Sequence, residues 1–506
     1  MGILDDYKQK NLNKHTTKGI YFGAPEAEAE NLSGHSLSDY FDDFLGILTD
    51  LEQLKFIFIG RKGVGKSAIA KFLKDKSDKS EDSWATLLKL SDYKTETVIQ
   101  QQEEHKQSEY DSLLFEWLIL INIVKLILKS GNGYTLEYEK LQTFIDKNSG
   151  LVAIDKFQIT EAFEKTGGEI KFGVLTHAFG GIFKKYFDVK VSKAPFYQLI
   201  PPLKEVVQKI LNYEVNQSSE FWILFDDLDI NFDIKNVRDR NLIIELIRIA
   251  KNYNNDILKN TGVKVLIFLR DDIRNALISE YSDSAKLFNS YEILINWYKD
   301  NVTNENDLPI KKLVERRIQI GFKNKGIRIA NGISPWDSLF ADDNYSSAYP
   351  KSSFKYILDF TFYRPRDFIT LLNVISQEEY NYPIKMNSVK RIINRYVAIN
   401  IKEIKSELSL YFTEKEKGLL FNDLFCYIID NQPTFTKATL KIKDLFPLRE
   451  DDIMEILFSY NLFVLQKEDG TEIYVSYRDN RLDTLKKEEL KILLHKCIYT
   501  YYKKLM

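Results

Sequence analysis

Short apolar runs alternate with longer polar segments along the first 300 residues. Five runs rich in β-branched and aromatic side chains predict buried strands, because continuous apolar stretches of this length are typical of parallel sheets covered on both faces. They occupy residues 54–59 (LKFIFI), 84–90, 221–229 (FWILFDDLD), 263–269 (VKVLIFL) and 291–296 (YEILIN). Helical patterns lie between them, so the sequence predicts an α/β fold with a parallel sheet.

A long insertion separates the second predicted strand from the third. Residues 95–215 begin with a helical pattern that contains the longest apolar run, residues 115–128. That run is too short and too polar to span a bilayer, so we expect a buried helix and no membrane contact. Residues 166–200 are rich in glycine and aromatic residues and predict strands or irregular structure. We expect them to form a surface that binds a partner or mediates assembly, or else an ordinary covering loop. Residues 322–353 are a second excursion, with no assigned role.

The last hundred residues show three short amphipathic patterns followed by a hairpin with its turn at residues 468–470. This order is typical of a winged helix. A DNA-reading winged helix carries basic residues on its third helix, but here Arg449 stands beside Glu450, Asp451 and Asp452. Residues 401–506 contain 17 Lys and Arg against 18 Asp and Glu, a net charge of −1. We therefore expect a protein-contact or regulatory domain, and direct nucleic-acid binding is not favoured.

Composition narrows the class of protein. The 506 residues include 71 Lys and Arg, 73 Asp and Glu, two Cys and five His, with 44% hydrophobic residues. This balance excludes wholesale disorder and a disulfide scaffold, and it gives no general attraction to polyanions. No Cys or His pair stands at metal-ligand spacing. The first residues lack the apolar run of a signal peptide, so we expect a cytoplasmic protein.

Glycines follow the first predicted strand at the spacing of a phosphate-binding loop. Gly60-x4-Gly65-Lys66-Ser67 stands between a strand and an amphipathic helix, the context that this motif requires. Glycines let backbone N–H groups turn toward phosphates, Lys66 reaches the β- and γ-phosphates, and Ser67 binds Mg²⁺. The alternative is a simple glycine turn before a helix. The residues expected to contact the nucleotide are Gly60, Arg61, Lys62, Gly63, Val64, Gly65, Lys66, Ser67 and Ala68.

Two carboxylates end the third predicted strand, at the edge where α/β proteins bind ligands. We expect Asp226 to hold Mg²⁺ and Asp227 to polarise an attacking water. The alternative is an acidic loop after a core strand. Arg270 ends the next strand, where it is placed to sense the γ-phosphate or to clamp Asp227. The alternative there is a helix start capped by Asp271 and Asp272.

The motifs that are missing also favour one nucleotide. No NKxD box occurs, so ATP is favoured over GTP. No LSGGQ-like signature lies between the glycine loop and Asp226, which argues against an ATPase of the ABC transporter or repair type. A strand between the loop strand and the aspartate strand predicts the additional-strand class of P-loop ATPases.

Four segments together resemble a known group of proteins: GRKGVGKSAIAKFL, FWILFDDLD, VLIFLRDD and FYRPRDFITLLN. They resemble prokaryotic P-loop ATPases related to the STAND and origin-recognition-like (AAA+-related) groups, in particular those found in bacterial anti-phage defence loci. The resemblance covers most of residues 20–506, strongly at these motifs and weakly between them. It implies an ATPase core, a helical lid and a winged helix, usually in an oligomeric or switch-like assembly.

The resemblance also implies roles for the YRPRD segment. In the resembled group such a lid segment packs on the nucleotide, with Pro365 near the base and an arginine near the phosphates. We expect Arg366 rather than Arg364 to be that arginine; the alternative is a basic helix start that pairs with nearby acids. Arg316 and Arg317 are further candidates for an arginine finger, although a solvated helix face is the simpler expectation for them.

These observations predict four parts: a lead-in segment at 1–50, a P-loop ATPase core at 51–300, a helical lid at 301–400 and a winged helix at 401–506. We expect a Mg²⁺-dependent ATPase switch that controls self-assembly as a homo-oligomer, or a separate effector such as a nuclease or toxin. The effector is expected on a partner because only about 50 residues precede the first strand. The alternatives are a DNA-bound ATPase of the origin-recognition or clamp-loader kind, and a scaffold that binds ATP without hydrolysing it.

Overall fold

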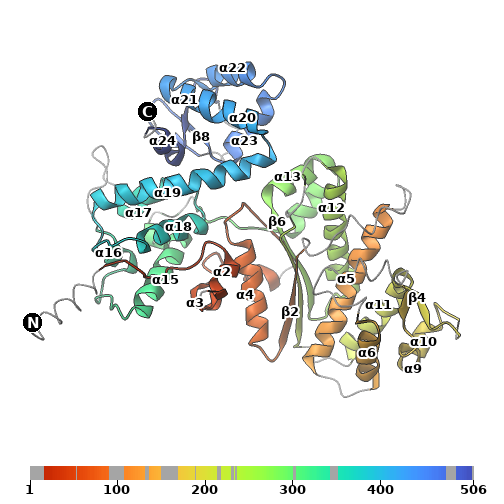
Figure 1. The fold of residues 1–506 in the computed structure, drawn as a ribbon. Coiled ribbons are helices and arrows are strands. Elements are labelled where there is room, and N and C mark those ends of the chain that lie inside the picture. The colour runs from red at the N-terminus through yellow and green to blue at the C-terminus, as the bar shows by residue number, and fades with distance from the viewer. Residues whose placement is uncertain are drawn as a thin grey trace, which may run out of the picture. The chain divides into compact units, whose positions relative to one another are not determined.

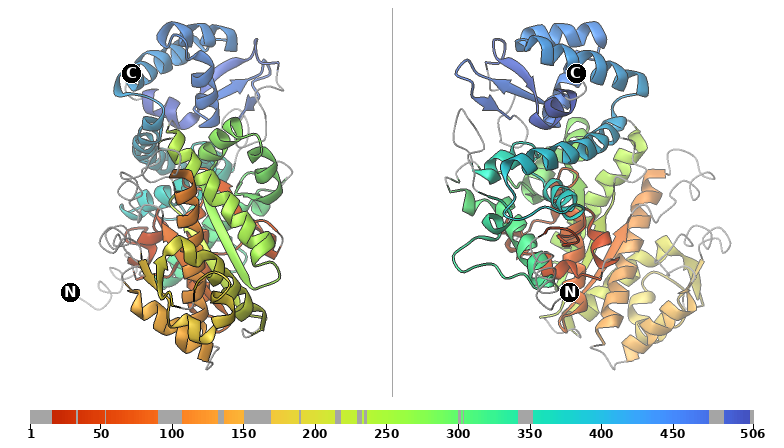
Figure 2. Two further views of the ribbon diagram at one scale, coloured as in Figure 1. Left: turned by 90° about the vertical axis from the view of Figure 1, so that its right-hand side faces the viewer. Right: turned by 60° about the vertical axis from the view of Figure 1, so that its left-hand side comes forward.

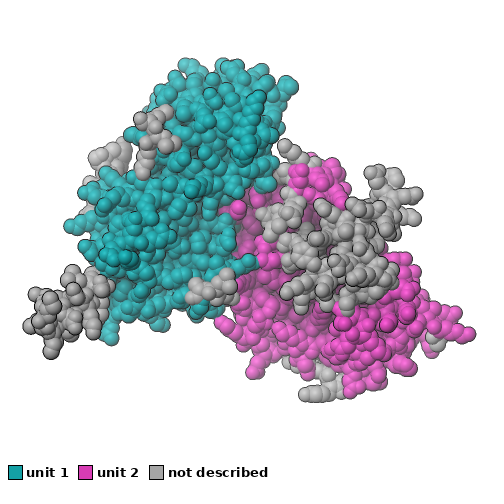
Figure 3. All heavy atoms as spheres, viewed as in Figure 1, with its two compact units in different colours: residues 1–45, 63–65, 296–506 teal, residues 46–62, 66–295 magenta. Residues whose placement is uncertain are grey.

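The computed structural model describes most of the chain, and Figure 1 shows its elements. The described residues fall into two compact units (Figure 3). One unit comprises residues 46–62 and 66–295, and the other comprises residues 1–45, 63–65 and 296–506. The residues described are 16–32, 34–52, 54–89, 107–131, 136–149, 169–188, 190–213, 218–228, 233, 236–299, 302, 304–341, 352–474 and 486–503.

A five-stranded parallel sheet forms the centre of the 46–295 unit. Its strands lie in the order β2-β5-β6-β1-β7, so β6 separates β1 from β5, as the additional-strand prediction requires. Nearly every residue of the three central strands is buried, which explains their continuous apolar sequences. All five predicted strands are confirmed: β1 (Ile57–Gly60), β2 (Ser83–Lys89), β5 (Glu220–Asp226), β6 (Val263–Arg270) and β7 (Glu292–Leu294). This mixed α/β architecture is consistent with a P-loop NTPase fold.

Helices cover both faces of this sheet (Figure 1). α4 (Lys66–Asp78) packs on one face, and α5 (Gln107–Ser130) and α12 (Val237–Asn252) pack together on the other. The predicted buried apolar run lies in α5. Among the helices that the structure describes, none has the length and apolar character needed to cross a membrane. The remaining short helices of this part are η1 (Thr49–Glu52), η4 (Tyr253–Ile257), α13 (Asp271–Glu280) and α14 (Ser284–Tyr291).

The insertion between β2 and β5 forms a small module of its own, coloured orange to yellow in Figures 1 and 2. A two-stranded antiparallel sheet flanks two single-turn helices, and Phe172, Phe179 and Phe183 of this module are buried. Part of residues 166–200 is therefore strand, as predicted, but the segment also enters a long helix at Phe196. Its elements are α6 (Leu136–Lys147), β3 (Glu169–Lys171), α9 (Leu175–Ala178), α10 (Gly180–Phe183), β4 (Lys193–Pro195) and α11 (Phe196–Tyr213).

The second unit begins with a lead-in segment and helices. Its first part contains α2 (Ala27–Leu32), α3 (Leu37–Tyr40), η5 (Glu305–Asp307), α15 (Pro309–Asn324), α16 (Pro335–Leu339), α17 (Ser353–Leu358), α18 (Pro365–Ser376), α19 (Met386–Glu407) and η6 (Leu408–Leu410). Of the excursion at 322–353, residues 342–351 lie outside the described part. Helices make up much of the described part of 301–400, with non-helical segments at 325–334, 359–364 and 377–385 between them.

The C-terminal part of this unit combines helices with a three-stranded antiparallel sheet in the order β10-β8-β9. The three predicted helical patterns and the hairpin are present, and Gly470 turns the chain with a φ of +83°. The elements are α20 (Glu414–Gly418), η7 (Leu419–Leu424), α21 (Phe425–Asn431), α22 (Phe435–Leu445), α23 (Glu450–Ser459), β8 (Phe463–Gln466), β9 (Glu472–Ile473), β10 (Lys491–Leu494) and α24 (Lys496–Lys503).

Candidate functional site

The glycine loop leaves β1 at Gly60 and enters α4 at Lys66, which confirms the predicted strand, loop and helix. Gly63 and Gly65 have φ angles of +83° and +105°, a region that residues with a side chain rarely adopt. The loop conformation therefore requires glycine at both positions. Of the other predicted nucleotide contacts, Lys62 is exposed, whereas Arg61 and Ala68 are half-buried.

Lys66 lies folded over the start of the loop. Its Nζ donates hydrogen bonds to the backbone carbonyls of Gly60, at 2.8 Å, and Arg61, at 3.1 Å. The half-buried ammonium is thus held at the base of the loop. This position suits an ammonium that neutralises a phosphate cradled by the loop.

Asp226 and Ser67 meet at the end of β5. The Ser67 hydroxyl is hydrogen-bonded to the Asp226 carboxylate, which is only 3% exposed. Burial, followed by the charge of Asp227, raises the pKa of Asp226 to about 6. The two side chains offer hard oxygen donors of the kind that Mg²⁺ prefers, and one or two protein ligands are sufficient for Mg²⁺ at a nucleotide. The donor set predicted for Mg²⁺ therefore fits the ion.

Asp227 is held in a different way from its neighbour. Its φ of +53° is unusual for a residue with a side chain and turns the chain sharply after β5. Its carboxylate forms an ion pair with Lys89 Nζ at 2.9 Å. Lys89 ends β2 and lies opposite Asp226 in the strand register. Sequence reasoning missed Lys89, because only the pairing of β2 with β5 brings it to this edge.

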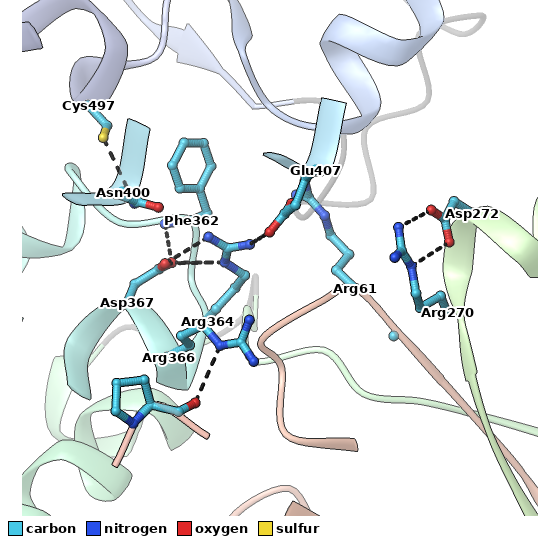
Figure 4. A network of polar contacts seen from close by, with 12 residues as sticks. Arg61, Arg270, Asp272, Phe362, Arg364, Arg366, Asp367, Asn400, Glu407 and Cys497 are labelled. Carbon is cyan, nitrogen blue, oxygen red and sulfur yellow. Dashed lines mark hydrogen bonds and ion pairs between the residues drawn. The ribbon is translucent and has the colours of Figure 1, made fainter. Parts of the chain in front are cut away.

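Arg270 ends β6, and the two acids that follow it begin α13; Figure 4 shows Arg270 and Asp272. The Arg270 guanidinium binds the Asp272 carboxylate, with Nε donating to Oδ1 at 3.0 Å. Asp271 is half-buried, and its burial raises its pKa against the lowering effect of Arg61 and Lys66. The sequence suggested only helix-capping roles for these acids. Asp271 in fact adds a second carboxylate, after Asp226, to the surroundings of Lys66.

The YRPRD segment starts α18 as predicted, with Arg364 as the residue before Pro365 at the first helical position. Arg364 is buried, and its guanidinium pairs with Asp367 at 2.9 Å and with Glu407 at 3.2 Å (Figure 4). Arg366 is half-buried, and its Nε donates to the Pro25 carbonyl at 3.4 Å. The pairing of Arg364 agrees with the preference for Arg366 as the phosphate-sensing residue, which stays a prediction.

The backbone around α18 also contacts the tip of the glycine loop, which belongs to the same unit. The Arg366 N–H donates to the Gly63 carbonyl at 3.3 Å. The Trp297 indole N–H donates to the carbonyl of Val64 at 2.8 Å, and Val64 is buried. Two carbonyls of the loop are therefore occupied by donors, which leaves the loop's N–H groups as its chemistry toward a phosphate.

The two candidates for an arginine finger differ in burial. Arg316 is exposed, as expected for a solvated helix face. For Arg317 that expectation is wrong: its Nη1 lies 3.3 Å from the fully buried Glu30 and donates to the Phe22 carbonyl at 3.1 Å. A Cβ added at Gly23 would lie 1.6 Å from the same Nη1. Arg317 is therefore built into the packing of the lead-in segment.

Three comparisons relate the chain to known proteins. Residues 309–405, which contain α15 to α18 and most of α19, match the model of the FunZ-associated C-terminal helical domain. A curated protein of Escherichia coli (strain K12), "Putative transposon gamma-delta 80.3 kDa protein", is 23% identical over 322 residues. A solved Walker-type ATPase of Pyrococcus abyssi is 12% identical, with a TM-score of 0.38, over 86% of this chain and 92% of that one.

These likenesses are partial. The match to the Escherichia coli protein covers 59% of this chain and 42% of the relative, so this chain spans less than half of that protein's length. At a TM-score of 0.38 the Pyrococcus abyssi structure adds nothing to the fold described above. What the chain is similar to is thus a helical domain over residues 309–405 and part of a transposon-associated protein.

Proposed function

We propose that this chain is a Mg²⁺-dependent ATPase that acts as a molecular switch. The observation that carries the proposal is the pair of Ser67 and Asp226, a hydroxyl and a buried carboxylate in direct hydrogen bond beside a glycine loop. A carboxylate with a pKa near 6 is stabilised as an anion by a cation, and phosphate groups bring Mg²⁺ with them.

Each remaining side chain has a role in this proposal. The loop N–H groups and Lys66 bind the phosphates, and Asp227 orients the attacking water, with its own position fixed by Lys89. Mg²⁺, when bound with ATP, would neutralise charge on the β- and γ-phosphates. Arg366 and Arg270 are the proposed sensors of the γ-phosphate, and Pro365 is the proposed contact to the base.

We propose that the nucleotide state of this switch controls either self-assembly or a separate effector protein, and that the protein acts in the cytoplasm. The C-terminal helices and sheet are proposed to be a winged-helix domain that contacts protein rather than DNA. Its third helix, α23, begins with Glu450, Asp451 and Asp452, whose charges repel phosphates. A role in anti-phage defence rests only on the resemblance of the sequence motifs. A plaque assay with the gene and its neighbours that gave no protection would remove this part.

ATP binding and turnover by the purified chain test the proposed activity. We expect Mg²⁺-dependent hydrolysis that falls at least about 100-fold in Lys66→Ala and in Asp227→Ala. Retained ATP binding in Asp227→Ala would separate its role in the chemical step from binding. Lys323→Ala is a matched control, because Lys323 is an exposed lysine at the end of α15, away from these residues in sequence and unit.

Turnover that is unchanged in both variants would contradict the mechanism. Tight ATP binding with no hydrolysis in a single-turnover experiment would instead identify a scaffold. Duplex DNA binding that is lost on mutation of α23 would identify the DNA-bound alternative.

A further inference from the structure

The module between α6 and α11 carries an excess of positive charge. Residues 169–198 contain five lysines and two acids, a formal charge of +3 in a chain whose net charge is −2. All five lysines are exposed. The positive charge of this module is therefore a local surface feature that the net charge of the whole chain does not reveal.

Two of these lysines lie directly opposite each other. In the antiparallel pair of β3 and β4, Lys171 is in register with Lys193. Side chains of such a pair lie on the same face, about 5 Å apart at Cβ, and like charges there destabilise the sheet. The other face of the pair holds the buried Ile170 and Ala194. The exposed face of the pair thus carries these two ammonium groups together, with Glu169 beside Lys171 on the same face.

The charges of this surface are largely uncompensated. Among the residues that the structure describes, Lys171, Lys184, Lys190 and Lys193 form no ion pair, whereas Lys185 is paired with Glu205 at 2.7 Å. Four ammonium groups are thus available for an anionic partner. Four separate ammonium groups on one small module match a polyanion, which offers a phosphate to each, better than a single small anion.

Two exposed aromatic rings accompany the lysines. Tyr186 is 43% and Tyr197 is 41% exposed. Each is fixed in place: the Tyr186 hydroxyl donates to the Glu205 carboxylate, and the Tyr197 ring lies against Phe196 with centroids 5.7 Å apart. Held, exposed aromatic rings beside lysines are the combination on which bases of a single strand stack.

The frame beneath these side chains is rigid. The buried Asn148 side chain bonds both the N–H and the carbonyl of Lys171, at 2.9 and 2.8 Å. Phe172 packs against Phe183 and Phe187, with centroids 5.4 and 4.6 Å away. The lysines and tyrosines therefore extend from a fixed surface and need little ordering on binding.

We propose that the surface formed by Lys171, Lys184, Lys190, Lys193, Tyr186 and Tyr197 binds single-stranded nucleic acid. It binds phosphates through the lysines and bases through the tyrosines, without reading sequence. This site belongs to the 46–295 unit and uses no residue of α23, whose acidic start argued against DNA reading, and it does not depend on the proposed ATPase activity.

Fluorescence anisotropy of labelled 20-nucleotide dT and U strands with the full chain tests the proposal. With four phosphate contacts, the logarithm of the binding constant falls with the logarithm of the salt concentration with a slope of about −2.8. Affinity therefore falls about 50-fold between 50 and 200 mM salt. In the double variant Lys184→Glu/Lys193→Glu, at least two contacts are lost. The affinity of this variant at 50 mM salt is then lower, and it falls by at most about sevenfold between 50 and 200 mM salt.

Two further variants separate charge from stacking and folding. Tyr197→Ala lowers single-strand affinity severalfold with the salt slope unchanged, whereas Tyr197→Phe keeps the affinity. Lys323→Glu/Lys437→Glu removes the same charge from exposed lysines of the other unit and leaves binding unchanged. Circular dichroism checks that each variant is folded.

Four results would overturn the proposal. These are no single-strand binding at 50 mM salt, duplex bound as tightly as single strands, equal loss in the control variant, or binding to anionic phospholipid vesicles in place of nucleic acid. Loss of ATP turnover in Lys66→Ala with single-strand binding intact is the expected sign that the two sites are independent.

Discussion

Two of the places where the described residues bury charge, one in each unit, differ in whether the fold itself stabilises the charged form. Around α18, the Arg364 guanidinium is shared by Asp367 and Glu407, and all three side chains are at most 4% exposed. Burial alone would lower the pKa of Arg364, but these two carboxylates outweigh it and raise the pKa above its usual range. At the end of β5, Asp226 is equally buried, yet its pKa is also raised, to about 6, which for an acid means that its charged form is destabilised.

The difference separates a structural cluster from a binding site. A buried arginine whose pKa rises is stabilised as a cation by the fold itself. A buried aspartate whose pKa rises has been placed without enough positive charge, and a ligand that brings a cation relieves that deficit. Lys66 lies near Asp226 and lowers its pKa, but less than burial raises it. The comparison predicts that mutations in the two clusters change stability in opposite directions.

Arg364→Met gives the largest effect. It leaves Asp367 and Glu407 buried without their shared partner, and breaking such a pair costs about 3–5 kcal/mol of unfolding free energy. Urea denaturation at pH 7.5 measures it. Arg364→Lys should recover part of this loss, since it keeps the charge without the two-pronged geometry. A loss below about 1 kcal/mol in Arg364→Met would contradict a structural role for this cluster.

Asp226→Asn changes stability with the opposite sign. Because the folded-state pKa of about 6 exceeds the ordinary value of 3.8, the folded protein holds a proton that the unfolded chain releases between pH 4 and 6. Stability therefore falls as pH rises through that window. Asparagine removes this penalty, so the variant should be more stable than the parent by about 1–3 kcal/mol at pH 7.5, and equal to it near pH 4.

Asp226→Asn should also lose Mg²⁺-dependent ATP turnover. This one variant should therefore gain stability and lose activity. A destabilised Asp226→Asn at pH 7.5 would show that Asp226 is held by the fold, like Arg364, and would remove the basis of the comparison.

Mg²⁺ binding should weaken in acid because protonated Asp226 does not bind the ion. Its ionised fraction falls about fourfold from pH 7.5 to pH 5.5 for a pKa of about 6, so Mg²⁺ affinity in the presence of ADP should fall about fourfold. Isothermal titration calorimetry measures this, and titration of Mg²⁺ into free ADP at both pH values provides the correction. Affinity that is independent of pH after correction would speak against Asp226 as the ligand.

Lys18→Ala should have the smallest effect. Its ion pair with Glu379 has both side chains 62% exposed, and such pairs contribute within about 0.5 kcal/mol of zero. The unfolding free energies of Lys18→Ala and Arg364→Met, measured in the same urea series, test whether burial explains why the two ion pairs differ in their contribution to stability. A loss as large as that of Arg364→Met would show that burial is not what distinguishes the pairs.

Local chemistry explains what the sequence predicted well. The strand at 54–59, the turns at Gly63 and Gly65 and the acids after 221–225 follow from neighbouring residues, so their pattern sufficed. Lys89 and Asp271 were missed because their partners come from other strands and loops, which no local pattern reveals. The burial of Arg317 was missed for the same reason: its partner Glu30 lies 287 residues away. The roles of the site residues in nucleotide chemistry remain predictions that the variants above test.

Gly23 has a consequence for how this protein evolves. Its missing side chain is the space that the Arg317 guanidinium fills on its way to Glu30. In a set of homologous sequences, positions 23, 30 and 317 should therefore be inherited as a unit. A lineage that replaces the glycine should also lose the arginine, and with it the acid.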